Sequence, residues 1–130
     1  IRDRLFVEDH VKALLMVATK GTPGETYNIG GLNEMTNIDV IKKICSILNK
    51  KIPCDDGFNY KDLITKVTDR PGHDKRYAID CSKIQEELNW RPEESFDSGI
   101  IKTVEWYLEN KDWWKKLVNK DYKLERKGKI

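Results

Sequence analysis

Apolar residues recur at helical spacing near the start of the chain, at Val11, Leu14, Leu15 and Ala18. This spacing places the four side chains on one face of a helix, and we expect that face to be buried. Asp9 is suited to cap the N-terminus, so the predicted helix runs from His10 to about Lys20. Gly21 follows it and is expected to end it.

A cap and a second apolar stripe predict another helix further along the chain. Thr36 followed by Asp39 is a variant of the capping box. The stripe that we expect to be buried consists of Ile41, Ile44, Cys45 and Leu48. Within it, Cys45 is expected to be a small core residue and not a nucleophile.

Two more helices are predicted in the second half of the chain. Ser82 and Gln85 have capping-box spacing and open a short helix through Leu88. The strongest pattern runs from Phe96 to Leu108, with inward positions at Ile100, Ile101, Val104 and Leu108. Aromatic side chains that we expect to pack, and not to stack on nucleic-acid bases, are Trp106, Tyr107, Trp113 and Trp114.

Three segments have the alternation of short strands: Ile1–Val7, Thr26–Ile29 and Arg76–Asp80. A further extended piece is expected at Leu63–Thr68. The alternation of strands and helices indicates an α/β class, or mixed α+β for a fragment, with a few short strands and four helices. The chain begins at Ile1 and not at Met, and its strands are few. We therefore expect that missing residues supply part of the sheet.

Composition excludes several classes of function. The 130 residues suffice for one modest domain, which we place at residues 1–114, followed by a Lys-rich tail at 115–130 that we expect to be solvated and partly frayed. Lys plus Arg number 24 and Asp plus Glu 22, so no strong positive charge demands a nucleic acid or a membrane. The three cysteines lack metal-ligand spacing, and reduced thiols in a cytoplasmic protein are the expected state.

The candidate chemistry lies in the turn Asp69-Arg70-Pro71-Gly72-His73-Asp74. Pro71-Gly72 favours a turn, while the Arg70 guanidinium and the His73 imidazole are donors suited to an anion such as phosphate. More basic residues stand at the chain start and after the turn: Arg2, Arg4, Lys75 and Arg76. If the fold joins the two stretches, a diphosphate clamp results. The alternative is a solvated turn in which Arg and Asp pair with each other.

The other motifs in the sequence give little evidence of a cofactor, catalytic or metal site. The glycines at 21, 24, 30 and 31 do not have the strand–glycine turn–helix order of a dinucleotide site. Tyr107 and Lys111 have the spacing of a catalytic tyrosine–lysine pair, but a chain rich in both residues produces it by chance. His10 and His73 have no third partner at metal-ligand spacing, so no metal site is expected.

Several segments, in order, resemble the C-terminal part of the dTDP-glucose 4,6-dehydratases, which belong to the extended short-chain dehydrogenase/reductases. The segments are residues 1–10, 24–31, 69–74, 76–80, 88–92 and 99–107. The resemblance implies a parent enzyme with a Rossmann portion that binds NAD and with dTDP-glucose as substrate. The implied reaction oxidises the sugar at C4, eliminates water across C5 and C6 and returns hydride to C6. By this resemblance, the cofactor-binding loop and the catalytic residues belong to the N-terminal portion, which is absent here. The fragment is therefore expected to be inactive alone.

The same resemblance implies a set of substrate-binding residues: Arg2, Asn37, Asp69, Arg70 and His73. It also implies a homodimeric, cytoplasmic parent. Two departures are visible, since Arg4 stands where the family usually has an aromatic residue, and Tyr122 is only a weak match for a substrate-binding tyrosine near the C-terminus. The alternatives are a non-catalytic nucleotide-sugar binding module and a fragment of a related UDP- or GDP-sugar dehydratase or epimerase.

Overall fold

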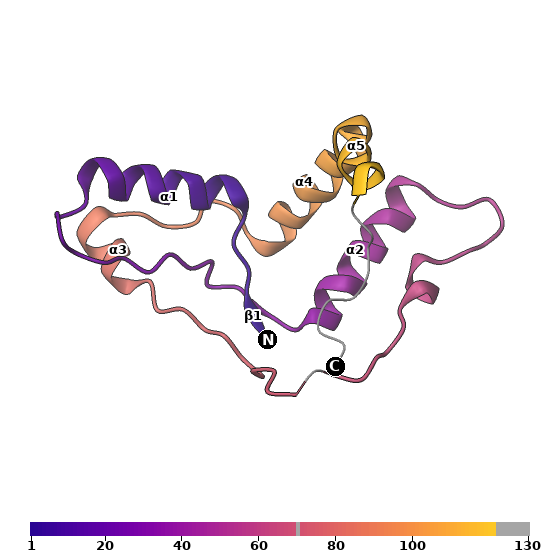
Figure 1. Cartoon of the computed structure of the whole chain (residues 1–130), viewed down its shortest axis with the longest axis horizontal. Helices are drawn as coiled ribbons and strands as arrows, with labels where there is room; N and C mark the ends of the chain where they lie inside the picture. The colour runs from indigo at the N-terminus through magenta and orange to yellow at the C-terminus, as the bar shows by residue number, and fades with distance from the viewer. Residues whose placement is uncertain (70, 122–130) are drawn as a thin grey trace.

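The computed structural model describes residues 1–69 and 71–121 of the chain. Its elements, in order, are β1 (Arg2–Asp3), α1 (Val7–Lys20), β2 (Glu34–Met35), α2 (Asn37–Lys51), the 3-10 helix η1 (Tyr60–Leu63), α3 (Ser82–Leu88), α4 (Phe96–Glu109) and α5 (Lys111–Asp121). In Figure 1, α1 and α3 lie together at one end, α2, α4 and α5 lie at the other, and β1 lies between them. The fold is mixed α and β, as expected.

The two strands form the only ladder among the described residues. They pair antiparallel, with Arg2 opposite Met35 and Asp3 opposite Glu34. A single parallel bridge joins Arg2 to Tyr77. The predicted strands at Thr26–Ile29 and Arg76–Asp80 are therefore wrong as strands, and the strand predicted at Ile1–Val7 is limited to Arg2–Asp3. Of the extended piece predicted at Leu63–Thr68, Leu63 belongs to η1, and Ile64, which follows it, has an extended backbone. A strand needs a neighbour to accept its hydrogen bonds, and the described part of this chain offers few.

The core between α1 and α3 is small. Ala13, Cys81, Ile84 and Trp90 are buried together. The partly buried side chains packed against them are Leu5, Met16, Val17, Tyr27, Ile29 and Leu88. A second contact region joins α2 to α4 and to η1, with Cys45, Ile47 and Val104 buried. The prediction that Cys45 is a core residue is confirmed.

The predicted inner face of α1 is wrong. Val11, Leu14 and Leu15 are 58%, 51% and 65% exposed, and Ala18 is exposed too. The face that meets α3 instead carries Ala13. The helical period was read correctly, but nothing among the described residues covers the apolar stripe.

The start of α1 also differs from the prediction. The helix begins at Val7 after Phe6, and no side chain caps it. Asp9, predicted as the cap, lies within the first turn and is 1% exposed. Its Oδ2 accepts a hydrogen bond from the backbone N–H of Glu94 at 3.0 Å. Asp9 therefore holds the segment before α4 against α1.

The caps of the later helices are partly as predicted. Thr36 accepts from the N–H of Asp39 at the start of α2. The predicted capping box of Ser82 is wrong, because Ser82 is the first helical residue and its own N–H donates to Asp80 Oδ1 at 2.9 Å. Helix α3 nevertheless ends at Leu88 and α4 covers the predicted range. Ile41 and Ile101 are 42% and 37% exposed, so the predicted stripes of α2 and α4 are only partly buried.

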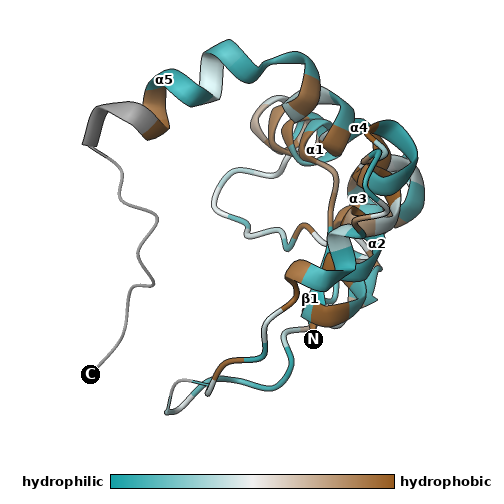
Figure 2. Cartoon of the chain, turned by 90° about the vertical axis from the view of Figure 1, so that its right-hand side faces the viewer, coloured by the Kyte–Doolittle hydropathy of each residue, from teal (hydrophilic) through white to brown (hydrophobic). Residues whose placement is uncertain are grey.

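Helix α5 was not predicted. The sequence analysis expected four helices, and the described residues form five α-helices. Most of α5 is hydrophilic, with only scattered apolar segments, which is why the pattern gave no signal (Figure 2). Trp114 Nε1 donates to the carbonyl oxygen of Tyr107 at 2.8 Å, and the rings of Trp106 and Trp113 meet edge to face. These contacts join the start of α5 to α4, and the helix runs on to Asp121 within the segment predicted as a tail. Residues 122–130 lie outside the described residues.

No helix in the described ranges is both long and apolar enough to cross a membrane.

We predict that Asp9→Ala lowers the free energy of unfolding of the chain by about 1–3 kcal/mol, because the partly buried N–H of Glu94 loses its acceptor. Asp9→Asn keeps an acceptor oxygen and should cost less than Asp9→Ala. The neighbouring exposed residue offers a control, Glu8→Ala, which removes only a first-turn charge. Urea unfolding measures all three, and an Asp9→Ala variant as stable as the wild type would contradict this role.

Candidate anion-binding site

Arg2 lies at the centre of the candidate site. Its Nη1 donates to the carbonyl oxygens of Ile1 at 2.6 Å and of Asp74 at 3.2 Å. Its Nη2 lies 2.6 Å from His73 Nε2. The guanidinium also lies 4.3 Å from the centre of the Tyr77 ring, as a cation over an aromatic face. The β1 segment and the central turn, far apart in sequence, are therefore in contact.

The proton on His73 is fixed by its partners. Arginine only donates, so His73 Nε2 has to accept from Arg2. The neutral ring then carries its proton on Nδ1, which donates to Asp69 Oδ1 at 2.8 Å. A line of contacts runs from Asp69 through His73 to Arg2 and sets the direction of the guanidinium.

Arg2 keeps its positive charge without a carboxylate beside it. The side chain is half-buried and makes no ion pair with any residue in the described ranges. Nη1 and Nη2 make three contacts, with two backbone carbonyl oxygens and one imidazole nitrogen, and a guanidinium has five N–H donors, so further donors remain. A pre-oriented, uncompensated guanidinium is the arrangement that binds phosphate.

Asp3 fixes the chain beside Arg2. Its Oδ2 accepts from Gly31 N at 2.7 Å and its Oδ1 from Asn33 N at 2.8 Å. The backbone N–H of Arg4 donates to Asn33 O. A Cβ at Gly31 would lie 2.1 Å from the carbonyl oxygen of Arg4, so this close approach requires glycine. The loop that leads into β2 and α2 is thereby held against β1.

Asn37 is the first residue of α2. Its Oδ1 accepts from Arg4 Nη2 at 2.8 Å. Met35 lies opposite Arg2 in the ladder, and Asn37 comes two residues after Met35. Asn37 therefore lies close to Arg2 in space.

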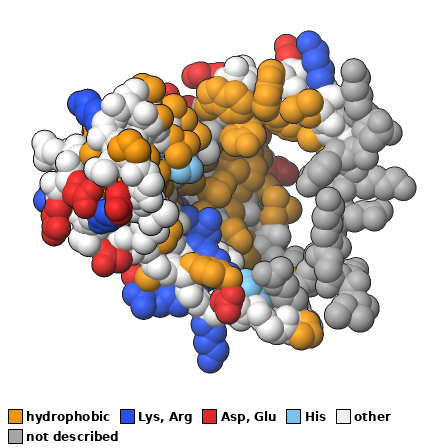
Figure 3. Space-filling view, turned by 60° about the vertical axis from the view of Figure 1, so that its left-hand side comes forward, with side chains coloured by type: hydrophobic (Ala, Val, Ile, Leu, Met, Phe, Trp, Pro, Cys, Tyr) orange, Lys and Arg blue, Asp and Glu red, His pale blue; other side chains and the backbone are white. Residues whose placement is uncertain are grey.

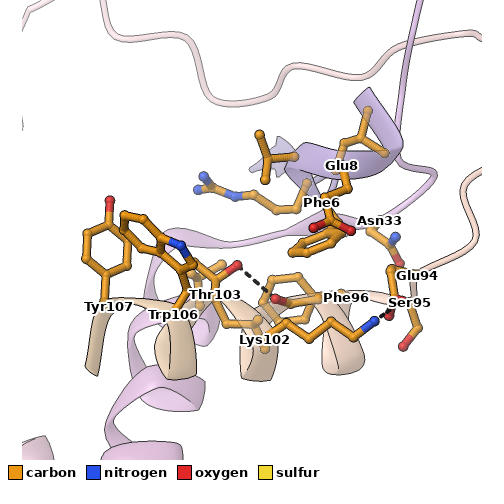
Figure 4. A pocket seen from close by; sticks show the side chains of 16 residues that line it. Phe6, Glu8, Asn33, Glu94, Ser95, Phe96, Lys102, Thr103, Trp106 and Tyr107 are labelled. Atoms are coloured by element: carbon orange, nitrogen blue, oxygen red, sulfur yellow. Dashed lines mark hydrogen bonds and ion pairs between the residues drawn. The ribbon is translucent and has the colours of Figure 1, made fainter. Parts of the chain in front are cut away.

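A cavity of about 740 Å³ opens between the start of α1 and the helices α2 and α4. Figure 4 shows Phe6 and Phe96 facing each other across it, with Trp106 and Tyr107 further along α4. Arg4 also lines it. Figure 3 shows a hollowed face with apolar side chains inside and basic side chains and a histidine at its edge. Because Arg4, which lines this recess, follows Arg2 by two residues, the chain carries the anion-binding cluster close to an open apolar recess.

Charged pairs border the recess and the strands. Lys102 donates to Glu94 and lowers the pKa of that carboxyl below its usual value. The Arg76 guanidinium makes two hydrogen bonds to Glu34, at 2.6 and 2.5 Å, and turns away from the turn towards β2. Arg76 is therefore committed to a carboxylate and is not part of the cluster around Arg2.

The predicted site residues divide into three groups. Arg2, Asp69 and His73 are in one cluster, and Asn37 is held separately by Arg4. Arg70 and Tyr122 lie outside the described residues. The role of Asp3 was not predicted, because its use depends on the two backbone N–H groups of a distant loop.

Tyr107 and Lys111 are on different helices, since α4 ends at Glu109 and α5 begins at Lys111. The Tyr107 ring is 52% exposed and packs edge to face on Trp106. No three His, Cys, Asp or Glu side chains gather as a metal site would need anywhere in the described ranges. The geometry around Arg2 supports binding of an anion and includes no catalytic arrangement that we can name.

Comparison with known proteins identifies the family. A family model described as GDP-mannose 4,6 dehydratase matches residues 1–103. The chain belongs to this family of nucleotide-sugar dehydratases. It is 57% identical to a dTDP-glucose 4,6-dehydratase of Escherichia coli over 100% of the chain, and 56% identical to one of Neisseria meningitidis over 98%. It spans 36% and 37% of the lengths of these two dehydratases, and corresponds to their C-terminal part.

Solved dehydratase structures agree. The dTDP-glucose 4,6-dehydratase of Bacillus anthracis str. Ames in complex with NAD matches 88% of this chain with a TM-score of 0.75 and 43% identity, over 33% of its own length. DesIV of Streptomyces venezuelae, a dTDP-glucose 4,6-dehydratase with NAD and TYD bound, matches 88% with a TM-score of 0.70 and 38% identity, again over 33% of its length. The resemblance inferred from sequence motifs is confirmed.

We predict a pH dependence for the pair that joins β2 to the segment after the turn. The hydrogen bond from Arg76 lowers the pKa of Glu34, and burial acts in the opposite sense without reversing the shift. In the unfolded chain Glu34 has its ordinary pKa, so the pair stabilises the fold above that value and loses this contribution as pH falls through the lowered pKa.

Arg76→Met should therefore return the Glu34 pKa towards its ordinary value in a carbon-13 NMR titration of the carboxyl group. Lys43→Met, which breaks a different exposed pair with Asp97, is the control and should leave Glu34 unchanged. An unchanged Glu34 pKa in Arg76→Met would show that the pair does not form in solution.

Proposed function

We propose that this chain is the substrate-binding C-terminal part of an NAD-dependent dTDP-glucose 4,6-dehydratase. The full protein would convert dTDP-glucose to dTDP-4-keto-6-deoxyglucose with loss of water, as a cytoplasmic homodimer. The observation that carries the proposal is 57% identity to a dTDP-glucose 4,6-dehydratase over the whole chain. The motifs at the start, the Gly30-Gly31 loop and the central turn lie within that match.

The geometry of Arg2 supports the binding of the nucleotide diphosphate. Its guanidinium is half-buried, oriented by His73 and Asp69, and carries a charge that no carboxylate among the described residues neutralises. A charge-assisted hydrogen bond to phosphate would complete its coordination. We assign the same ligand to Asn37 and, from the turn motif, to Arg70, which lies outside the described residues.

NAD does not fit the glycines of this chain. The N–H of Gly31 already donates to the Asp3 carboxylate at 2.7 Å. The backbone of Arg4 fills the space beside Gly31, where a phosphate would have to approach. A carboxylate at this position also repels a pyrophosphate. We therefore assign NAD to a Rossmann portion upstream of this chain, which relatives crystallised with NAD also favour.

The exposed stripe on α1 supports the same division. Val7, Val11, Leu14 and Leu15 are each at least half exposed on one helix. Apolar side chains gathered on one helix face are normally covered by another element. We propose that the upstream portion covers this stripe in the full protein.

The first test is enzymatic. The 130-residue chain with NAD and dTDP-glucose should form no 4-keto product, whereas the full-length protein should form it. Product formation can be followed by the absorbance of the keto sugar in alkali and by mass spectrometry. Turnover by the chain alone would contradict the assignment of NAD binding and catalysis to a portion upstream of this chain. Turnover of a UDP- or GDP-sugar in preference to dTDP-glucose would contradict the substrate.

The second test concerns the clamp. Arg2→Met or Arg70→Ala in the full-length protein should weaken dTDP binding about tenfold or more, because a charge-assisted hydrogen bond to phosphate is lost. NAD affinity should change little. Lys83→Met removes a cation on α3 that pairs with Glu25 and makes no contact with the cluster around Arg2, and serves as the matched control. Equal dTDP affinity in Arg2→Met and wild type, measured by calorimetry, would remove Arg2 from the site.

A further inference from the structure

Arg4 connects β1 to the first turn of α2 by a single side-chain hydrogen bond. Its Nη2 donates to Asn37 Oδ1 at 2.8 Å. The Arg4 backbone is itself fixed, since its N–H donates to Asn33 O at 2.9 Å and its carbonyl lies against Gly31. The Arg4 end of the contact is therefore held by the surrounding chain.

This contact decides which way the Asn37 amide points. An amide side chain can rotate to exchange its oxygen and nitrogen positions, and the two choices present opposite chemistry to a ligand. A guanidinium donates only, so the atom that faces Arg4 has to be the oxygen. The Nδ2 group, with two hydrogens, is then directed away from Arg4 and remains a donor.

The placement of Arg4 has a free-energy cost, because one donor of its side chain has no acceptor in the described part of the chain. Its Nε is buried and has no hydrogen-bond partner among the described residues. A buried donor without an acceptor destabilises a fold, and such groups in native proteins call for an explanation in function or bound solvent. Arg4 also lines the cavity, as Val40 does from the first turn of α2. Arg4 is therefore held beside the recess with one buried donor unpaired among the described residues.

We propose that Arg4 is a positioning residue that orients Asn37 as a hydrogen-bond donor to the acceptor oxygens of the bound sugar nucleotide. This inference rests on the proposed function, because Asn37 is assigned there as a ligand contact. It goes further in naming which atom of Asn37 binds and which side chain enforces that choice.

A double-mutant cycle for dTDP binding to the full-length protein tests the proposal. Arg4→Met keeps the apolar stem and removes the donors, so packing is preserved while Asn37 loses its orientation. Arg4→Met and Asn37→Ala should each weaken binding about three- to tenfold, the range of one hydrogen bond. The double variant should be no weaker than Asn37→Ala, because Arg4 acts only through Asn37.

Two further variants separate orientation from other effects. Lys43→Met breaks the 2.7 Å pair between Lys43 on α2 and Asp97 on α4, a tether of the same helix that does not touch Asn37. It should leave dTDP affinity within about twofold of wild type. Arg4→Lys retains one cationic donor and should restore most of the affinity lost in Arg4→Met. Thermal unfolding of each variant confirms that it is folded before binding is measured.

The outcomes distinguish the inference from the proposed function. Wild-type protein that does not bind dTDP would overturn the proposed function, and the inference with it. Wild-type binding together with unchanged affinity in Arg4→Met and Arg4→Lys would overturn the inference and leave the function standing. Additive losses in the double variant would mean that Arg4 contacts the nucleotide directly, which also contradicts a positioning role.

Discussion

The carboxylate of Asp3 is the interaction on which the site depends. By accepting from Gly31 N and Asn33 N it fastens the loop before β2 to the strand that carries Arg2. That attachment sets the β1–β2 register, which in turn places α2 and its first residue beside β1. The glycine at position 31 is required by the same contact, since any side chain there would collide with the Arg4 carbonyl. Two short strands are thus enough to position the start of α2 beside Arg2.

The second constraint is the pattern of hydrogen-bond donors and acceptors along Asp69, His73 and Arg2, which leaves only one place for the imidazole proton. An arginine can only donate and an ionised aspartate can only accept, so the imidazole between them is left with one neutral tautomer. This orders the guanidinium without neutralising it. A direct Arg–carboxylate pair would have held Arg2 as firmly but would have compensated the charge that an anionic ligand needs. Arg76 shows that alternative, because both of its contacts go to Glu34.

Local patterns in the sequence were sufficient for helices α1 to α4 but not for α5, and they named the chain start and the central turn as two basic stretches without predicting that these meet. Thr36, Leu88 and Phe96 mark helix boundaries through nearest neighbours along the chain, and those boundaries are confirmed. The inner face of α1 and the strands at Thr26–Ile29 and Arg76–Asp80 were wrong, since burial and pairing depend on partners that a local pattern does not contain. The burial of Asp9 was missed for the same reason: its partner is the N–H of Glu94. Asn37 was found only through family resemblance, because its chemistry is that of any residue at a helix start.

The central claim is that this chain binds the diphosphate of a sugar nucleotide through Arg2 and its neighbours while another part of the protein holds NAD. A crystal structure of the full-length protein with NAD and dTDP tests this most directly. We expect diphosphate oxygens within hydrogen-bond distance of Arg2, Asn37 Nδ2 close to a ligand oxygen, and NAD bound entirely by residues upstream of Ile1. A nucleotide diphosphate bound away from Arg2, or NAD seated against the Gly30-Gly31 loop, would contradict the account.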